Sequence, residues 1–521
     1  MKKNVLLLVL AVCAAFPALA APPRLIVQIV VGSMRASDLD RYAANFDEGG
    51  FRRLTEGGTV YADARYDYAQ TSTPVSLATL TTGAMPSTHG VIGGSWIDYT
   101  SNKKVYLTDG YRGPGAYQLL APTLGETLAR HIGGSRSVTV AAEAESAIVA
   151  GGHTDAVFWL GEERCTWETS LYYAPQEPEW VARSNRERYN LSYIPLEWRT
   201  LYDRSRYLNT RYWDITLTGR SRREKDLGGK GRLTLESDYE RLLDTPAGNS
   251  AVLGFAKQAI AQYGLGEDEQ TDLLTVCLDS SRRIAEAYGP ESVEVEDMYY
   301  RLDRDLADFL TFLFAQVKEG AVTVVLTSDH GTSPSFDAAE EPAERFNGRQ
   351  FEVIASGFLN VRYGSGDWVL RYENRNLWLN HNLIYERGLD LASVQNEVAI
   401  FAMQFRGVSH ALTSTAMRTS YFGSGYARKM QNGFYPSRSG DVAINLLPEW
   451  IEERDRCVSA SGSMYGYDTR VPLVFYGLGA GPERVRRPVE MISVAPTLAA
   501  LAGVEAPAAS EGSVLTEIVD L

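Results

Sequence analysis

A carboxylate and an imidazole stand side by side at Asp329 and His330, directly after the apolar, mainly β-branched run Thr323–Leu326. Such a run is typical of a strand that is buried on both faces in the middle of a parallel sheet. Ligands of open α/β sheets bind beyond the carboxyl ends of the strands, and aspartate and histidine both bind zinc. The pair is therefore a candidate for half of a zinc site, although the two side chains could also bond only to each other and to neighbouring backbone.

Two other candidate residues stand where predicted elements begin or end. Thr73 precedes Pro74, and this order is typical of a helix with threonine as its N-cap and proline at its first helical position. That helix is predicted to continue to Gly83, and Asp279 ends a predicted strand that begins at Asp272. The sequence alone leaves open whether Thr73 has any role beyond capping.

Strands and helices alternate along most of the chain, which indicates a parallel sheet and an α/β fold. The predicted strands lie at 24–31, 58–65, 137–142, 272–278, 323–326 and 471–476, and the predicted helices at 122–131, 251–263, 297–317 and 493–501. These elements must position the candidate residues, and we expect them to form one domain over residues 21–521.

Two segments interrupt the alternation and are interpreted as irregular insertions at about 159–244 and 333–453. The first is dense in aromatic residues, which indicates either the core of the insertion or a platform for a carbohydrate or aryl ligand, and its residues 221–232 form a basic loop. The second contains strand-like pieces at 352–361 and 368–372.

Composition limits the classes of function. The chain has 521 residues and a net charge of −14, so it has no overall attraction for nucleic acid. Residues 1–20 read as a cleaved secretory signal peptide, and no later segment is apolar and long enough to span a membrane. We therefore expect a periplasmic or secreted protein. Its cysteines at 165, 277 and 457 are too far apart and too few to predict a disulfide framework.

Several sequence blocks together resemble the alkaline phosphatase superfamily, and most closely its phosphate-irrepressible branch, which is similar to type I phosphodiesterases and nucleotide pyrophosphatases. The blocks include VVGSMR, TSTPVSLATLTTGAMPSTHGVIG, TSDHG and YGYDTRVPLVFYG. The resemblance implies a doubly wound, mostly parallel sheet with its active site at the carboxyl ends of the strands. It also implies two zinc ions on either side of a threonine or serine that attacks phosphorus.

The resemblance implies particular site residues, and only some of them are present. The nucleophile falls on Thr73, and the metal ligands that survive are Asp279, Asp329 and His330. The three other ligand positions hold Gly32, Arg283 and Ser461, none of which replaces a zinc ligand. Because zinc needs four ligands, or three and a water, we predict no metal or one weakly bound ion. Arg283 could stand where the second zinc stands in the family.

The family's phosphate contacts are also replaced. Their positions hold Gly94, Glu143 and Glu145, so two cationic contacts become acidic. Unit charges about 4 Å apart interact by roughly 4 kcal/mol at an effective dielectric of about 20, and phosphate is therefore not expected to bind. Glu143 and Glu145 could instead join Asp279 and Asp329 in an acidic pocket for a cation such as calcium, which takes oxygen ligands.

Two functions follow from this degraded site. The first is a secreted pseudoenzyme that binds an unknown protein or glycan partner and has lost the two-zinc phosphatase activity. The alternative is a phosphomonoesterase or phosphodiesterase that uses Thr73 as nucleophile with a single residual metal.

Overall fold

The computed structural model describes residues 21–194, 198–210, 214–216, 221–223, 232–233, 237–335, 345–454 and 457–519. The predicted signal peptide at 1–20 and most of the basic loop at 221–232 lie outside these residues. The helices of the described ranges include none with the length and apolar character needed to cross a membrane.

One large sheet organises the molecule. In spatial order it contains β20 (Glu483–Val485), β2 (Thr59–Arg65), β19 (Arg470–Gly477), β12 (Val322–Thr327), β1 (Leu25–Val31), β11 (Asp272–Leu278), β5 (Ser137–Ala141), β6 (Ala156–Leu160) and β7 (Trp167–Glu168), with β21 (Val489–Glu490) also paired to β2. Strand β1 is parallel to β11 and β12, and β5 is parallel to β11 and β6. Strand β19 is antiparallel to both of its neighbours. The predicted α/β fold with a mostly parallel sheet is confirmed.

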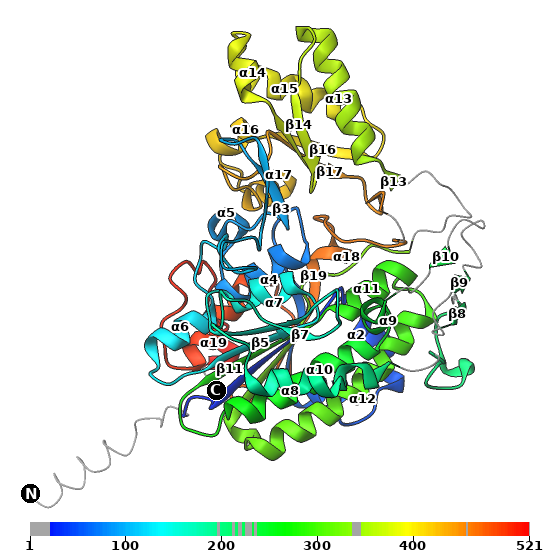
Figure 1. The fold of residues 1–521 in the computed structure, drawn as a ribbon, viewed down its shortest axis with the longest axis vertical. Coiled ribbons are helices and arrows are strands. Elements are labelled where there is room, and N and C mark those ends of the chain that lie inside the picture. Colours follow the sequence, from blue (N-terminus) through cyan, green and yellow to red (C-terminus); the bar gives the residue numbers. More distant parts are fainter. Residues whose placement is uncertain are drawn as a thin grey trace, which may run out of the picture.

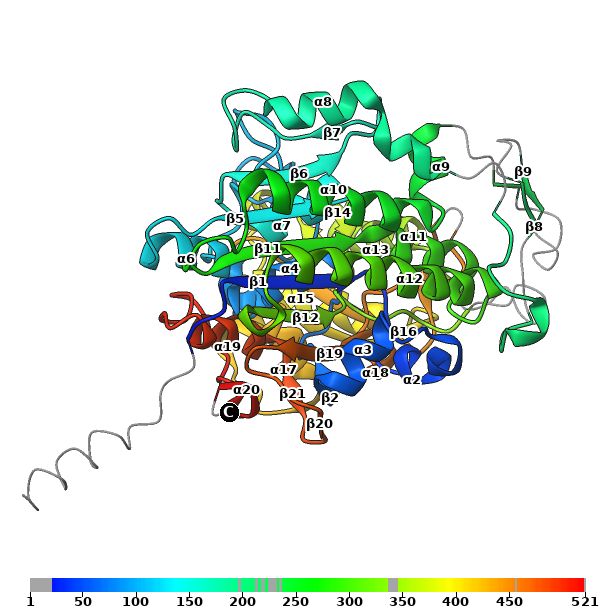
Figure 2. The same ribbon diagram turned by 90° about the horizontal axis from the view of Figure 1, so that it is seen from below.

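Helices cover both faces of this sheet, as expected for strands that are apolar on both sides. One face packs against α3 (Phe51–Gly57), α10 (Ala247–Tyr263), α11 (Asp279–Tyr288) and α12 (Val293–Gln316), and the other against α4 (Thr73–Thr82), α6 (Leu124–His131), α7 (Ala144–Gly151) and α19 (Val494–Leu501). Figure 1 shows α10 and α12 below the sheet and α4 and α7 above it. Seen from below in Figure 2, the strands succeed one another behind α10, α11 and α12.

The second insertion forms a small unit with its own apolar core, drawn at the top of Figure 1. Its antiparallel sheet has the order β14 (Val369–Glu373), β15 (Asn376–Leu379), β17 (Val442–Leu446) and β16 (Val408–Thr413). Helices α13 (Gly348–Tyr363) and α15 (Leu391–Ala402) supply core residues to this unit. The strand predicted at 368–372 is confirmed as β14, whereas the strand predicted at 352–361 is wrong, because that segment lies inside α13.

The aromatic residues of the first insertion are mainly packing residues. Trp167 is 2% exposed and stacks on Phe255 of α10, with ring centroids 3.9 Å apart. The indole nitrogen of Trp198 donates a hydrogen bond to Asp297 of α12. These rings therefore join the insertion to the body and do not form an exposed ligand platform.

Candidate active site

Thr73 begins helix α4, and its side chain points away from the helix backbone. The N-cap is Ser72, so the prediction that Thr73 caps the helix is wrong by one residue. The Thr73 hydroxyl instead donates a hydrogen bond to Asp329 Oδ2 at 2.6 Å, and its oxygen lies 3.2 Å from His330 Nε2. The capping role is therefore replaced by contacts with the Asp-His pair that follows β12.

The Asp-His pair is held in one orientation by the surrounding backbone. Asp329 Oδ1 accepts hydrogen bonds from the backbone nitrogens of Ser33 and His330 at 2.9 and 2.8 Å. His330 Nδ1 lies 2.7 Å from the carbonyl oxygen of Gly331, which can only accept, so Nδ1 carries a hydrogen. In the neutral ring, Nε2 therefore presents its lone pair towards Thr73. We call Thr73, Asp329 and His330 the reactive cluster.

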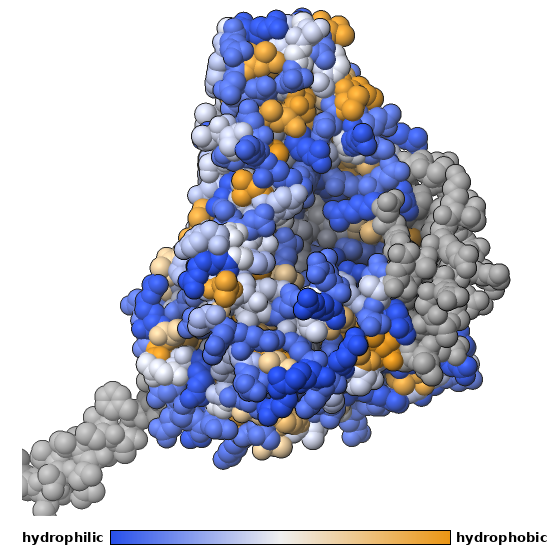
Figure 3. Space-filling view, viewed as in Figure 1, coloured by the Kyte–Doolittle hydropathy of each residue, from blue (hydrophilic) through white to orange (hydrophobic). Residues whose placement is uncertain are grey.

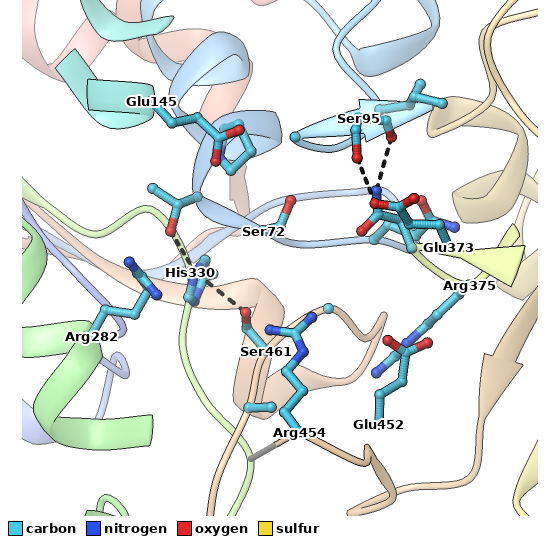
Figure 4. Close-up of a pocket in the computed structure, with 18 of the residues that line it drawn as sticks. Ser72, Ser95, Glu145, Arg282, His330, Glu373, Arg375, Glu452, Arg454 and Ser461 are labelled. Atoms are coloured by element: carbon cyan, nitrogen blue, oxygen red, sulfur yellow. Dashed lines mark hydrogen bonds between the residues drawn. The ribbon is translucent and has the colours of Figure 1, made fainter. Parts of the chain in front are cut away.

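The reactive cluster lies in a pocket of about 370 Å³ between the sheet and the second insertion. Figure 3 shows the surface hollowed between the upper insertion and the lower body, with mostly hydrophilic residues around the hollow. Figure 4 shows the pocket residues at close range, with His330 beside Ser461. Ser461 Oγ lies 3.3 Å from His330 Nε2.

Asp279 does not face the reactive cluster. Its Oδ2 accepts hydrogen bonds from the backbone nitrogens of Ala142 and Glu143 at 2.9 and 3.0 Å, and its Oδ1 accepts one from Ser146 Oγ at 2.6 Å. Burial raises the pKa of Asp279 above its usual range, and the nearby Glu143 raises it further. The carboxylate thus serves the first turn of α7, and the prediction that it is a residual metal ligand is not supported by its contacts.

Arg282 occupies the space next to the missing first ligand. A Cβ added to Gly32 would lie 2.9 Å from Arg282 Cβ and 3.2 Å from its backbone nitrogen. The Arg282 guanidinium forms ion pairs with Glu143 and, at 3.2 Å, with Glu286. Figure 4 shows this side chain reaching from α11 towards His330.

Arg283, which could stand where the second zinc stands in the family, forms its ion pairs with residues other than Asp279. Its Nε lies 2.6 Å from Asp244 Oδ1 and its Nη1 lies 3.4 Å from Glu143 Oε1, so it turns away from Asp279. The resemblance places the family histidine at position 283, but the preceding residue on α11 is the one that lines the pocket.

The donor atoms of the reactive cluster lie close together. Among the described residues, no group of three or more histidine, cysteine, aspartate or glutamate side chains could hold a metal. Thr73 Oγ1, Asp329 Oδ2 and His330 Nε2 lie within 3.3 Å of one another, so they could share one ion with open positions. The acidic calcium pocket is not formed, because Glu143 is ion-paired to Arg282 and Asp279 faces α7.

The two acids at the phosphate-contact positions are not two free negative charges. Glu143 is shared between Arg282 and Arg283. Burial, with Glu143 nearby, raises the pKa of Glu145 to about 7. A Cβ at Gly94 would lie 2.5 Å from Glu145 Oε1, so the carboxyl of Glu145 fills the space that a side chain at 94 would need. The predicted repulsion of phosphate is therefore weaker than the residue types alone indicate.

Three arginines from the described part of the chain line this pocket, Arg282, Arg375 and Arg454, and the sequence singled out none of them. Arg282 belongs to no motif, because the family's metal-binding histidine is expected at the next position, 283. Arg375 lies in the second insertion, between β14 and β15, where no motif stands. Arg282 and Arg375 could have been found only from the three-dimensional orientation of the helix and the hairpin that carry them.

Comparison with known proteins identifies the family. The sequence pattern of the family described as Type I phosphodiesterase / nucleotide pyrophosphatase matches residues 26–451. A protein of Myroides odoratus named calcium-transporting ATPase is 29% identical over 96% of this chain and 95% of its own length. Alkaline phosphatase PafA of Elizabethkingia meningoseptica is 28% identical over 95% of this chain and 94% of its own length. The crystal structure of wild-type PafA matches with a TM-score of 0.87 and 28% identity, covering 97% of this chain and 100% of that chain. The chain therefore belongs to the type I phosphodiesterase / nucleotide pyrophosphatase family, within the alkaline phosphatase superfamily.

Proposed function

We propose that this protein is a hydrolase of phosphoric esters with Thr73 as its nucleophile. The observation that carries the proposal is the reactive cluster, in which the hydroxyl of Thr73 lies 2.6 Å from Asp329 Oδ2 and 3.2 Å from His330 Nε2. A hydroxyl next to a carboxylate and an imidazole is within reach of a general base. The family membership and the relative named as an alkaline phosphatase favour this function over a scaffold without activity.

The residues divide the reaction into two steps. In the first, Thr73 Oγ1 attacks phosphorus, its proton passes to Asp329 or His330, and the bond from phosphorus to the leaving oxygen breaks. Glu145 lines the same pocket and its raised pKa of about 7 lets it donate the proton that the leaving alcohol needs. In the second, water attacks phosphorus, the bond from phosphorus to Thr73 Oγ1 breaks, and Thr73 regains its proton. The product is phosphate if the substrate is a monoester and a phosphomonoester if the substrate is a diester.

Charge in the pocket favours diesters over monoesters. A phosphodiester carries one negative charge. A monoester dianion carries two and needs more positive charge in the pocket to bind. The N-terminus of α4 lines the pocket and offers partial positive charge to phosphoryl oxygens. Arg282 adds a cation, but Glu143 and Glu286 already neutralise much of it.

One zinc ion would be held by Asp329, His330 and Thr73, and when bound it would supply Lewis-acid polarisation of a phosphoryl oxygen. Such an ion binds the native state and must raise the melting temperature with its concentration. We expect a zinc-dependent rise that disappears in His330→Gln, measured by differential scanning fluorimetry after chelation.

The test of the function compares bis(p-nitrophenyl) phosphate with p-nitrophenyl phosphate. We expect slow turnover of the diester by the mature protein, a loss of at least about 100-fold in Thr73→Ala, and partial retention in Thr73→Ser. Thr311→Ala, which changes an exposed threonine of α12, is the matched control. Equal rates in the wild type and Thr73→Ala would refute the proposal.

A ligand-binding scaffold without turnover is the second candidate. It is favoured by the close fit of Arg282 against Gly32, because that fit fills the space of the metal ligand that Gly32 replaces. If no ester is turned over while the zinc-dependent rise is also absent, this candidate replaces the first. The predicted leader at 1–20 supports export to the periplasm or beyond in either case.

A further inference from the structure

The side chain of Arg375 is buried, and no hydrogen bond or ion pair joins it to another described residue. It is 5% exposed and lines the pocket that contains the reactive cluster. Its Nη1 is buried without a hydrogen-bond partner, and none of the described carboxylates forms an ion pair with its guanidinium. Arginine stays charged in proteins, and a buried donor that lacks an acceptor destabilises the fold by about 1–3 kcal/mol. An acceptor supplied by a ligand would remove this deficit.

The hairpin that carries Arg375 is fixed in place. Its turn residues Asn374 and Arg375 both have left-handed backbone, with φ of 48° and 58°. The side-chain amide of Asn374 donates to the carbonyl of Ser95, and the carbonyl of Arg375 accepts from Ile444 N at 2.8 Å. The neighbouring Glu373 accepts from Ser95 Oγ and is paired with Lys104 at 2.7 Å. The guanidinium is therefore presented by a rigid support.

Arg375 is also close to the reactive cluster. A Cβ added to Gly462 would lie 3.7 Å from Arg375 Nη2, and Gly462 directly follows Ser461. Ser461 Oγ in turn lies 3.3 Å from His330 Nε2. Figure 4 places Arg375 across the pocket from Glu145, with Ser461 between the hairpin and His330.

The acids around Arg375 each bond to another residue through one of their two carboxylate oxygens. Glu452 accepts a hydrogen bond from the hydroxyl of Tyr372, and Asp468 Oδ2 accepts two from Ser463. Burial raises the pKa of Asp468 to about 6, against the opposing effects of His330 and Arg375. These groups leave the fork of Arg375 nitrogens available to a planar or tetrahedral oxyanion.

We propose that Arg375 binds an oxyanion, either phosphate or carboxylate, at the insertion side of the pocket. If the proposed hydrolase function holds, the oxyanion bound by Arg375 is part of the substrate, and only this step rests on that function. The favoured substrates are then esters that carry a second anionic group. The anion site itself does not require that any reaction takes place.

The test uses the full mature chain with Thr73→Ala, so that binding is read without turnover. Inorganic phosphate and acetate are titrated separately at constant ionic strength, by calorimetry and by thermal shift. We expect phosphate to bind, and Arg375→Gln to weaken it at least about tenfold, which is about 1.4 kcal/mol. Arg371→Gln, which removes an exposed arginine of β14, should leave the affinity unchanged. Whichever anion binds more tightly identifies the chemistry.

A second variant keeps the test decisive if Arg375→Gln does not fold. Glu452→Gln removes a competing negative charge and keeps an acceptor for Tyr372, so it should tighten phosphate binding. Unchanged affinity in both Arg375→Gln and Glu452→Gln, or no binding of either anion to the parent protein, would overturn the proposal. Failure of the hydrolase assay leaves these results untouched.

Discussion

At the scale of single residues, Gly32 and Arg282 form a matched pair. Neither residue alone explains the loss of this metal-ligand position, because glycine only removes a ligand and arginine only adds a charge. Together they bring α11 so close to the end of β1 that a Cβ at 32 would lie 2.9 Å from Arg282 Cβ. Restoring an aspartate at position 32 would therefore not restore a ligand unless α11 moved.

The pair gives a prediction about stability. Gly32→Ala should lower the free energy of unfolding by about 1–3 kcal/mol, because the added methyl overpacks a buried contact. Gly133→Ala is the control, since a Cβ there meets nothing within 4 Å, and it should stay within about 0.5 kcal/mol of the wild type. Urea unfolding of the three proteins measures both values. A Gly32→Ala protein as stable as the control would show that the contact relaxes freely.

Glu145 gives a prediction about pH. Its folded pKa of about 7 lies above the ordinary value of 4.5, so the unfolded chain releases this proton at lower pH than the folded chain does. Glu145 is therefore neutral to stability below about pH 4 and increasingly destabilising as the pH rises to 7 and above. Glu145→Gln should stabilise the protein at pH 8 by about 1–3 kcal/mol and by almost nothing at pH 4.

Chemical denaturation at the two pH values checks this expectation. Glu505→Gln, at an exposed glutamate, should show no such difference. An equal rise in the free energy of unfolding of Glu145→Gln at both pH values would refute the interpretation, since a change in packing does not depend on pH.

At the scale of elements, the sequence predicts strands better than it predicts which helix face meets the pocket. The run at 323–326 lies in β12 because its side chains are apolar on both faces. The position of Asp329 and His330 at the edge of the sheet could then be predicted from the end of that strand alone. Arg282 could not be assigned in the same way, because adjacent helix positions differ by about 100° in direction and Asp244 attracts Arg283.

Helix α13 shows a second limit. Its β-branched residues favoured a strand, yet Val353 and Val361 are 62% and 91% exposed. The buried residues are Phe351, Ala355 and Leu359, which are spaced by four and so lie on one helical face. The spacing of the apolar residues that are buried decides the element, and the sequence does not reveal in advance which ones are buried.

The same helix predicts a contrast between two truncations. Leu359→Ala should lower the free energy of unfolding by about 2–5 kcal/mol, because it leaves a cavity in the core of the insertion. Val361→Ala, only two residues away, should change it by less than about 0.5 kcal/mol. Denaturant unfolding followed by circular dichroism compares them. Similar losses in both variants would place α13 in a different orientation.

At the scale of the whole molecule, we expect apolar packing rather than metal to hold the fold. Two cores lie on either side of the large sheet and a third fills the second insertion. No described cluster of three or more ligands could act as a structural metal site. EDTA should therefore shift the melting temperature by less than about 1 °C in zinc-free buffer. Loss of the folded structure when EDTA is added would contradict this view.

The separate core of the insertion has a consequence for how the protein can diverge. The nucleophile stands on the body, whereas Arg375 stands on a hairpin that packs with the insertion. Mutations in that hairpin can alter which molecules enter the pocket without disturbing the packing around Thr73. Natural selection could thus change ligand preference and chemical reactivity in separate steps, each tolerated by the rest of the chain.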